Sequence, residues 1–203
     1  DHLAFLLALL LGVRSVRALI LTVTAFTVGH SLTLLAATGG WIAPKTGAVE
    51  MLIGYSILFA SLEAARRHGW RPSRRGVLAL SVLMALTLVL AGAGAIVTLA
   101  CALTTLALAL PQWPTALLAL AFGLIHGAGF AGAYADLLSS AELHWAPLLG
   151  FNLGVELGQL LVLALIGAVI LPARRWISGD GRQQVIHASL AGLLGLGLFW
   201  TLS

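Results

Sequence analysis

Apolar segments about 20 residues long, separated by short breaks rich in arginine, make up most of this chain. A bilayer core is about 30 Å thick, so a helix that crosses it needs roughly 20 apolar residues. Of the 203 residues, 60% are hydrophobic and 9% are charged, and the mean hydropathy is +1.04. This composition excludes a water-soluble globular domain. The sequence predicts an all-α fold, a polytopic bundle of transmembrane helices that forms one domain over residues 1–203.

The lengths of the apolar segments predict seven or eight spans. The segment 76–110 runs for 35 residues without a charge. One helix of that length would reach roughly 52 Å, which is far more than a bilayer needs. We therefore expect two short spans there, hinged near Gly92 and Gly94. The other expected spans are 1–13 (the end of a truncated span), 18–38, 46–65, 114–138, 147–171 and 185–202.

The arginines indicate how the bundle is oriented. They gather in the breaks 14–17, 66–75 and 174–182. The positive-inside rule places all three breaks in the cytoplasm, which requires the segment 76–110 to cross the membrane twice. The formal charge of +4 then reflects the orientation of the chain in the membrane. We expect the lipid bilayer as a partner and no nucleic acid.

The first apolar run, from Leu3 to Val13, is about half as long as a span requires. We therefore expect this chain to be the C-terminal membrane part of a longer protein.

Ionisable side chains lie inside the predicted spans, where a charge is expensive and is usually retained for a function. Their distances from the predicted span ends place them at similar depth, near the bilayer midplane. We therefore expect a shared polar pocket. The residues concerned are Asp1, His2, His30, His126 and Glu156.

Other polar side chains extend this predicted pocket. Asn152, Glu156 and Gln159 are spaced i, i+4 and i+7, so they share one face of a helix. Glycines at every fourth residue from 150 to 158 form a ridge on the opposite face, which would let another helix approach. Four residues are predicted to line a substrate path or to support the ligands: Ser31, Glu50, Asn152 and Gln159.

Imidazole and carboxylate groups in a dry interior are typical of metal binding. Both are common ligands of transition metals, and a divalent cation would offset the cost of burying the carboxylates. We therefore predict that a divalent transition metal (nickel, cobalt or zinc) binds in the pocket. The same groups could instead pass protons, because histidine titrates near neutral pH. The predicted metal ligands are Asp1, His2, His30, His126 and Glu156.

Four motifs together resemble the HupE/UreJ family of bacterial membrane proteins. The motifs are Asp1-His2-Leu3 with Phe5-Leu6-Leu7, Thr24-Ala25-Phe26-Thr27 with His30-Ser31-Leu32-Thr33-Leu34, Phe122-Gly123-Leu124-Ile125-His126-Gly127, and Phe151-Asn152-Leu153-Gly154-Val155-Glu156-Leu157-Gly158-Gln159. The resemblance implies nickel or cobalt uptake serving hydrogenase and urease, a multi-pass location in the inner membrane and an extracytoplasmic segment upstream. It also implies metal ligation at Asp1, His2, His30 and His126. Asn152 and Glu156 are implied as functional residues by the fourth motif.

Three classes of function stay open. We favour a secondary transporter (a permease) in which the buried site is reached alternately from each side. An intramembrane metal-dependent hydrolase would use Glu156 or Asp1 as general base, with Ser31 as the candidate hydroxyl. The sequence lacks Gly-x-Ser-x-Gly and His-Glu-x-x-His motifs, so we lean away from an enzyme. The third class is a membrane anchor or assembly factor, with a structural metal or none.

Overall fold

The computed structural model describes residues 2–13, 15–71, 73–90, 101–105, 108, 114–137, 145–173, 176 and 179–202. Every regular element in these ranges is a helix, which confirms the predicted all-α fold. The helices are α1 (His2–Gly12), α2 (Val16–Thr38), α3 (Thr46–Arg67), α4 (Arg74–Leu90), α6 (Thr115–Leu137), α7 (Trp145–Ala173) and α8 (Gly179–Leu202).

The lengths of these helices agree with a membrane-spanning bundle. Four segments are long and apolar enough to cross a bilayer, namely Val16–Thr38, Thr46–Arg67, Ala146–Ile170 and Gly179–Leu202, and His2–Gly12 and Thr115–Phe130 are shorter apolar helices. The segment expected to form a hairpin begins as α4, and residues 101–105 are also helical. Its expected hinge near Gly92 and Gly94 lies outside the described residues.

Local sequence signals set several helix ends. The Ser15 hydroxyl accepts a hydrogen bond from the Ala18 main-chain N–H at 3.2 Å and caps the start of α2. After α3 the chain turns at Gly69, whose φ of +103° is a left-handed conformation that glycine adopts without a steric penalty. After α2 the chain turns at Gly40, whose φ of +73° is also left-handed.

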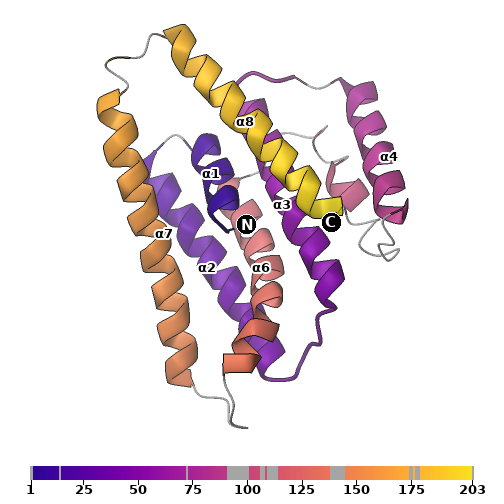
Figure 1. Cartoon of the computed structure of the whole chain (residues 1–203), viewed down its shortest axis with the longest axis vertical. Coiled ribbons are helices and arrows are strands. Elements are labelled where there is room, and N and C mark those ends of the chain that lie inside the picture. The colour runs from indigo at the N-terminus through magenta and orange to yellow at the C-terminus, as the bar shows by residue number, and fades with distance from the viewer. Residues whose placement is uncertain are drawn as a thin grey trace.

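The helices form an up-and-down bundle (Figure 1). In that view α2 and α6 run in the same direction, whereas α3 and α7 run the opposite way. The N-terminal end lies at mid-height, and α1 packs mainly on α3, with further contacts to α6, α7 and α8. The ends of α3 and α7 and the starts of α2, α4 and α8 share the upper end, so the three arginine-rich breaks flank one end of the bundle.

Two pairs of helices approach closely at glycines. A Cβ atom on Gly29, Gly123 or Gly127 would overlap main-chain atoms of the partner helix in the α2–α6 pair. A Cβ atom on Gly54 or Gly197 would likewise overlap main-chain atoms across the α3–α8 pair. Without a hydrophobic driving force in lipid, such small residues let the two backbones pack in van der Waals contact.

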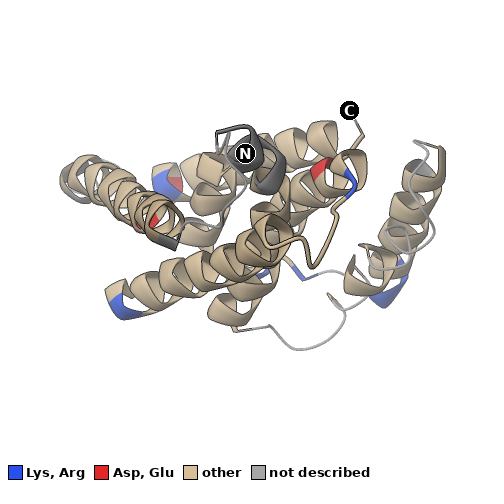
Figure 2. Ribbon diagram, turned by 90° about the horizontal axis from the view of Figure 1, so that it is seen from below, with Lys and Arg blue, Asp and Glu red and all other residues tan. Residues whose placement is uncertain are grey.

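Helix α7 lies at the outside of the bundle and packs mainly on α2. Leucines along its outer face, among them Leu149 (66% exposed) and Leu161 (61% exposed), suit contact with acyl chains. We expected the glycine ridge from 150 to 158 to receive another helix, but no described atom would lie within 4 Å of a Cβ added at these glycines. Charged residues are sparse on all the described helices (Figure 2), as a lipid environment requires.

Candidate metal site

Three histidines from three helices meet inside the bundle. The ring centroid of His2, at the start of α1, lies 5.8 Å from that of His30 on α2 and 4.7 Å from that of His126 on α6. His30 and His126 are completely buried. The structure therefore brings together three of the five predicted metal ligands, which we call the histidine cluster. The fourth, Asp1, lies outside the described residues.

Phenylalanine rings surround the histidine cluster. The His2 ring lies 5.7 Å from Phe26 and 4.9 Å from Phe130, between ring centroids. Phe5 lies 5.1 Å from the His126 ring. These apolar rings lower the local dielectric, which strengthens the hydrogen bonds that the buried histidines make to side chains outside the cluster.

Glycine contacts fix the separation between the two helices that carry His30 and His126. A Cβ atom on Gly127, the residue after His126, would overlap the main-chain carbonyl of His30. A Cβ on Gly123, one turn earlier, would overlap the carbonyl of Phe26. Glycine at these positions therefore sets the distance between the two imidazole-bearing backbones.

Asn152 determines which nitrogen of His30 carries the proton. The Asn152 amide nitrogen donates to the Leu148 carbonyl at 2.9 Å, so its Oδ1 is the atom that faces Nδ1 of His30, at 3.2 Å. Because Oδ1 can only accept, Nδ1 of His30 must be the donor. In a neutral ring, Nε2 of His30 is then an unprotonated acceptor.

Ser56 has the corresponding effect on His126. Its hydroxyl donates to the Ile53 carbonyl at 2.7 Å and lies 2.9 Å from Nε2 of His126. A hydroxyl has one proton, so Nε2 of His126 is the donor to the Ser56 oxygen. Nδ1 of His126 is therefore an unprotonated acceptor in the neutral ring.

Both acceptors, Nε2 of His30 and Nδ1 of His126, are buried and have no hydrogen-bond partner among the residues that the structure describes. A buried acceptor without a donor is costly. Hydrogen bonds that fix a histidine tautomer through the opposite ring nitrogen are typical of metal-binding histidines. These two nitrogens are donors of the kind that transition-metal ions accept.

The structure places Glu156 away from the histidine cluster. Its carboxylate accepts a hydrogen bond from the Thr24 hydroxyl at 2.9 Å. Thr24 precedes His30 by six residues, roughly 9 Å along the α2 axis. Because α7 runs antiparallel to α2, each turn beyond Asn152 meets an earlier turn of α2. Of the polar residues Asn152, Glu156 and Gln159 on α7, Asn152 is thus the one that contacts the histidine cluster. Glu156 lies about two turns from His30.

The other predicted path residues differ in their surroundings. Ser31 donates to the Thr27 carbonyl at 2.7 Å, within its own helix. Glu50 is exposed. Gln159 is buried, and within the described part of the chain neither atom of its amide has a hydrogen-bond partner.

Within the described residues, no group of three His, Cys, Asp or Glu side chains is arranged so that it could hold a metal ion. In the histidine cluster, the His2 ring meets those of His30 and His126 edge to face, at 78° and 87°. The three rings are neighbours, but they do not form a metal-binding arrangement among the described residues.

Ser56 is the site residue that the sequence analysis missed. It lies in the middle of an apolar span, at the depth expected for His30 and His126, and depth is the signal that could have identified it. It was overlooked because a serine can satisfy its hydroxyl by bonding the carbonyl of the preceding turn, which Ser56 also does.

An all-helical bundle with lipid-length apolar helices and a buried imidazole cluster defines a polytopic membrane protein. The family model described as HupE / UreJ protein matches residues 1–81 and 74–203. These matches cover the whole chain, so the chain belongs to the HupE/UreJ family, as its motifs predicted. No curated protein and no solved structure matches it.

Proposed function

We propose that this protein carries a divalent transition-metal ion, nickel or cobalt, across the bacterial inner membrane, and that the histidine cluster binds the ion in transit. One observation carries the proposal. Two fully buried imidazoles present unprotonated nitrogens, Nε2 of His30 and Nδ1 of His126, beside the ring of His2. Imidazole nitrogen is a common ligand of nickel, cobalt and zinc.

Binding one ion would require a small rearrangement of the histidine cluster. Metal–nitrogen bonds of about 2.0–2.1 Å require ligand nitrogens within roughly 4 Å of one another. Hydrogen bonds to Asn152 and Ser56 restrain the rings of His30 and His126. Asp1, predicted as a ligand from the sequence, immediately precedes His2 and would supply the negative charge.

Polar residues on α7 suggest the route of the ion. Glu156 and Gln159 follow Asn152 along the helix toward its arginine-flanked end. The positive-inside rule assigns that end to the cytoplasm. Glu156 would then receive the cation after it leaves the histidine cluster, as a carboxylate on the path and not as a ligand of the buried site.

The test compares wild type with His30→Ala, His126→Ala and the control His187→Ala, whose imidazole is exposed and lies outside the cluster. Nickel and cobalt bound per purified protein are measured by elemental analysis and titration calorimetry. We expect binding in wild type and in the control, and at least about tenfold weaker binding in the two cluster variants. Uptake of the metal into sealed proteoliposomes should likewise be retained in wild type and in His187→Ala and reduced in the two cluster variants.

Each other outcome has a definite meaning. If wild type binds neither metal, the proposal is overturned. If both cluster variants bind as wild type does, the ion is held elsewhere and the proposed site is wrong. Tight binding without uptake would retain the metal site but would favour the metal-dependent hydrolase over a transporter.

A further inference from the structure

A second feature of the bundle lies far from the histidine cluster, at its arginine-flanked end. A groove of about 630 Å³ opens between the end of α3, the turn that follows it and the middle of α8. This volume is within the range of about 300–1,000 Å³ that is typical of sites for small ligands. The groove is lined by Leu62, Ala65, His68, Gly69, Trp70, His187, Leu190, Ala191 and Leu194.

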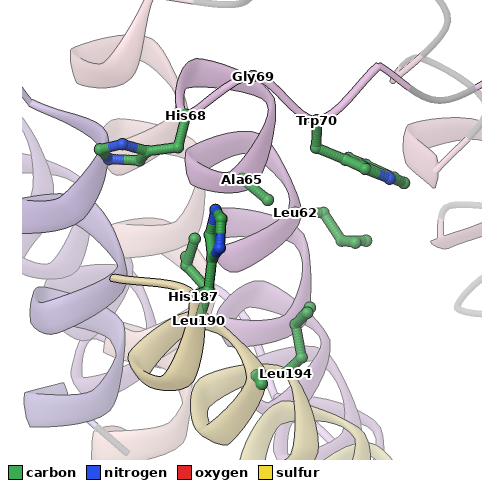
Figure 3. A pocket seen from close by; sticks show the side chains of 9 residues that line it. Leu62, Ala65, His68, Gly69, Trp70, His187, Leu190 and Leu194 are labelled. Carbon is green, nitrogen blue, oxygen red and sulfur yellow. The ribbon is translucent and has the colours of Figure 1, made fainter. Parts of the chain in front are cut away.

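The walls of the groove are mostly apolar, and its polar groups lie near the end of the bundle. Figure 3 shows Leu62 and Trp70 on the same side of α3, with the ring of His187 between α3 and α8. The ring of His68 turns the other way, and its Nε2 donates to the Leu11 carbonyl at 2.8 Å. His187 is thus the imidazole available to an occupant, and Trp70 is a residue type favoured at the membrane surface.

Exposed arginines lie in the segments that flank this end of the groove. Arg71 directly follows Trp70, Arg74 and Arg75 begin α4, and Arg182 precedes His187 by five residues on α8. Of the described carboxylates at this end, Glu63 is engaged by Arg66 at 2.8 Å and Arg67 at 3.4 Å. Asp180 at the start of α8 is the other. The excess of positive charge favours an anionic occupant.

We propose that this groove binds one anionic phospholipid from the surrounding bilayer. An acyl chain lies along Leu62, Leu190 and Leu194, and the phosphate lies among His187 and the exposed arginines. Three features together favour this occupant: the apolar walls of the groove, Trp70 in its lining, and exposed arginines in the segments that flank it. Each basic residue near an anionic membrane surface strengthens binding about fivefold.

The experiment measures which lipid the intact protein retains. Native mass spectrometry is performed on protein equilibrated with phosphatidylglycerol and phosphatidylcholine of identical chains. We expect several-fold preferential retention of phosphatidylglycerol, lost when Arg71, Arg74 and Arg182 are changed to Gln. Lys45→Gln, which removes an exposed cation at the other end of α3, is the charge control.

Two further measurements locate the lipid. Ala191→Phe fills the groove from an exposed position, whereas Ser189→Phe adds the same bulk about 200° around α8. We expect only Ala191→Phe to reduce retention. The Trp70 fluorescence, taken as wild type minus Trp70→Phe, should be quenched more by phosphatidylglycerol with brominated chains than by brominated phosphatidylcholine.

Equal retention of the two lipids would overturn the proposal. So would a preference for phosphatidylglycerol that survives both the arginine variant and Ala191→Phe, because the lipid would then bind elsewhere. Preserved helicity and a monodisperse elution profile show that each variant is folded. None of these measurements depends on metal binding or transport.

Discussion

The Ser56 hydroxyl oxygen and Nε2 of His126 lie 2.9 Å apart in the buried centre of the bundle. This contact joins α3 to α6 and leaves Nδ1 of His126 as a bare acceptor. Asn152 has the same relationship to His30 from α7. Each of the two imidazoles is therefore held by a neutral polar side chain from a helix other than its own.

The first prediction concerns Ser56→Ala. Loss of the hydroxyl removes the acceptor that holds the proton on Nε2 of His126, so the ring can adopt the other tautomer. We expect nickel affinity to fall about 10- to 100-fold, as for other residues that orient metal-binding histidines. Calorimetry gives the affinity, and ¹⁵N NMR of labelled histidine reports the tautomer directly.

Ser61→Ala is the matched control for this change. Ser61 is equally buried on the same helix, but among the described residues its hydroxyl bonds the Ile57 carbonyl and no histidine. Equal losses of affinity in the two variants would show that Ser56 acts through general packing and not through His126.

The second prediction concerns Gly127→Ala. The new methyl group would overlap the His30 carbonyl, so α2 and α6 must separate. Overpacking of this kind lowers the free energy of unfolding by about 1–3 kcal/mol. Unfolding in SDS measures this loss. Gly154→Ala on α7 has no described neighbour within 4 Å and should leave stability unchanged or slightly raised. A Gly127→Ala variant as stable as wild type would contradict the close approach of α2 and α6 at this glycine.

The third prediction separates binding from movement of the ion. Glu156 bonds Thr24 and lies about two turns from His30, so Glu156→Gln should leave nickel affinity within about twofold of wild type. Uptake into proteoliposomes should fall at least about tenfold, because the neutral amide no longer attracts the cation. A loss of equilibrium binding as large as that in His30→Ala would place Glu156 among the ligands instead.

The fourth prediction concerns Glu63, which is 3% exposed and contacts Arg66 and Arg67. Glu63→Gln removes the negative charge that pairs with both guanidinium groups, so we expect the free energy of unfolding to fall by about 1–3 kcal/mol. Glu50→Gln, on the same helix but exposed, should change it by less than about 0.5 kcal/mol. Similar effects of the two changes would mean that the Glu63 ion pairs contribute little.

Much of the fold could be predicted from the sequence because the bilayer imposes a length on each apolar segment. Counting residues from the arginine breaks placed His30 and His126 at the same depth, and the two rings do meet that of His2. Parallel directions for α2 and α6 follow from the same count.

Contacts between helices were less accessible to sequence analysis, since depth does not determine which faces of two helices meet. Glu156 shares a face with Asn152, yet its partner is Thr24, because the α2–α7 pair is antiparallel. The glycines that bring helices together here are Gly29, Gly123 and Gly127, whereas the more regular ridge on α7 has no described neighbour. Regular spacing alone did not identify the packed face.

The glycine contacts between α2 and α6 also limit how a buried ion could be released. With the His30 carbonyl against Gly127, neither helix can slide or rotate past the other without a steric clash. An opening motion must therefore carry both helices as one rigid unit. If the protein transports an ion as proposed, we expect the gates to lie at the boundaries of that unit with α7 and α1.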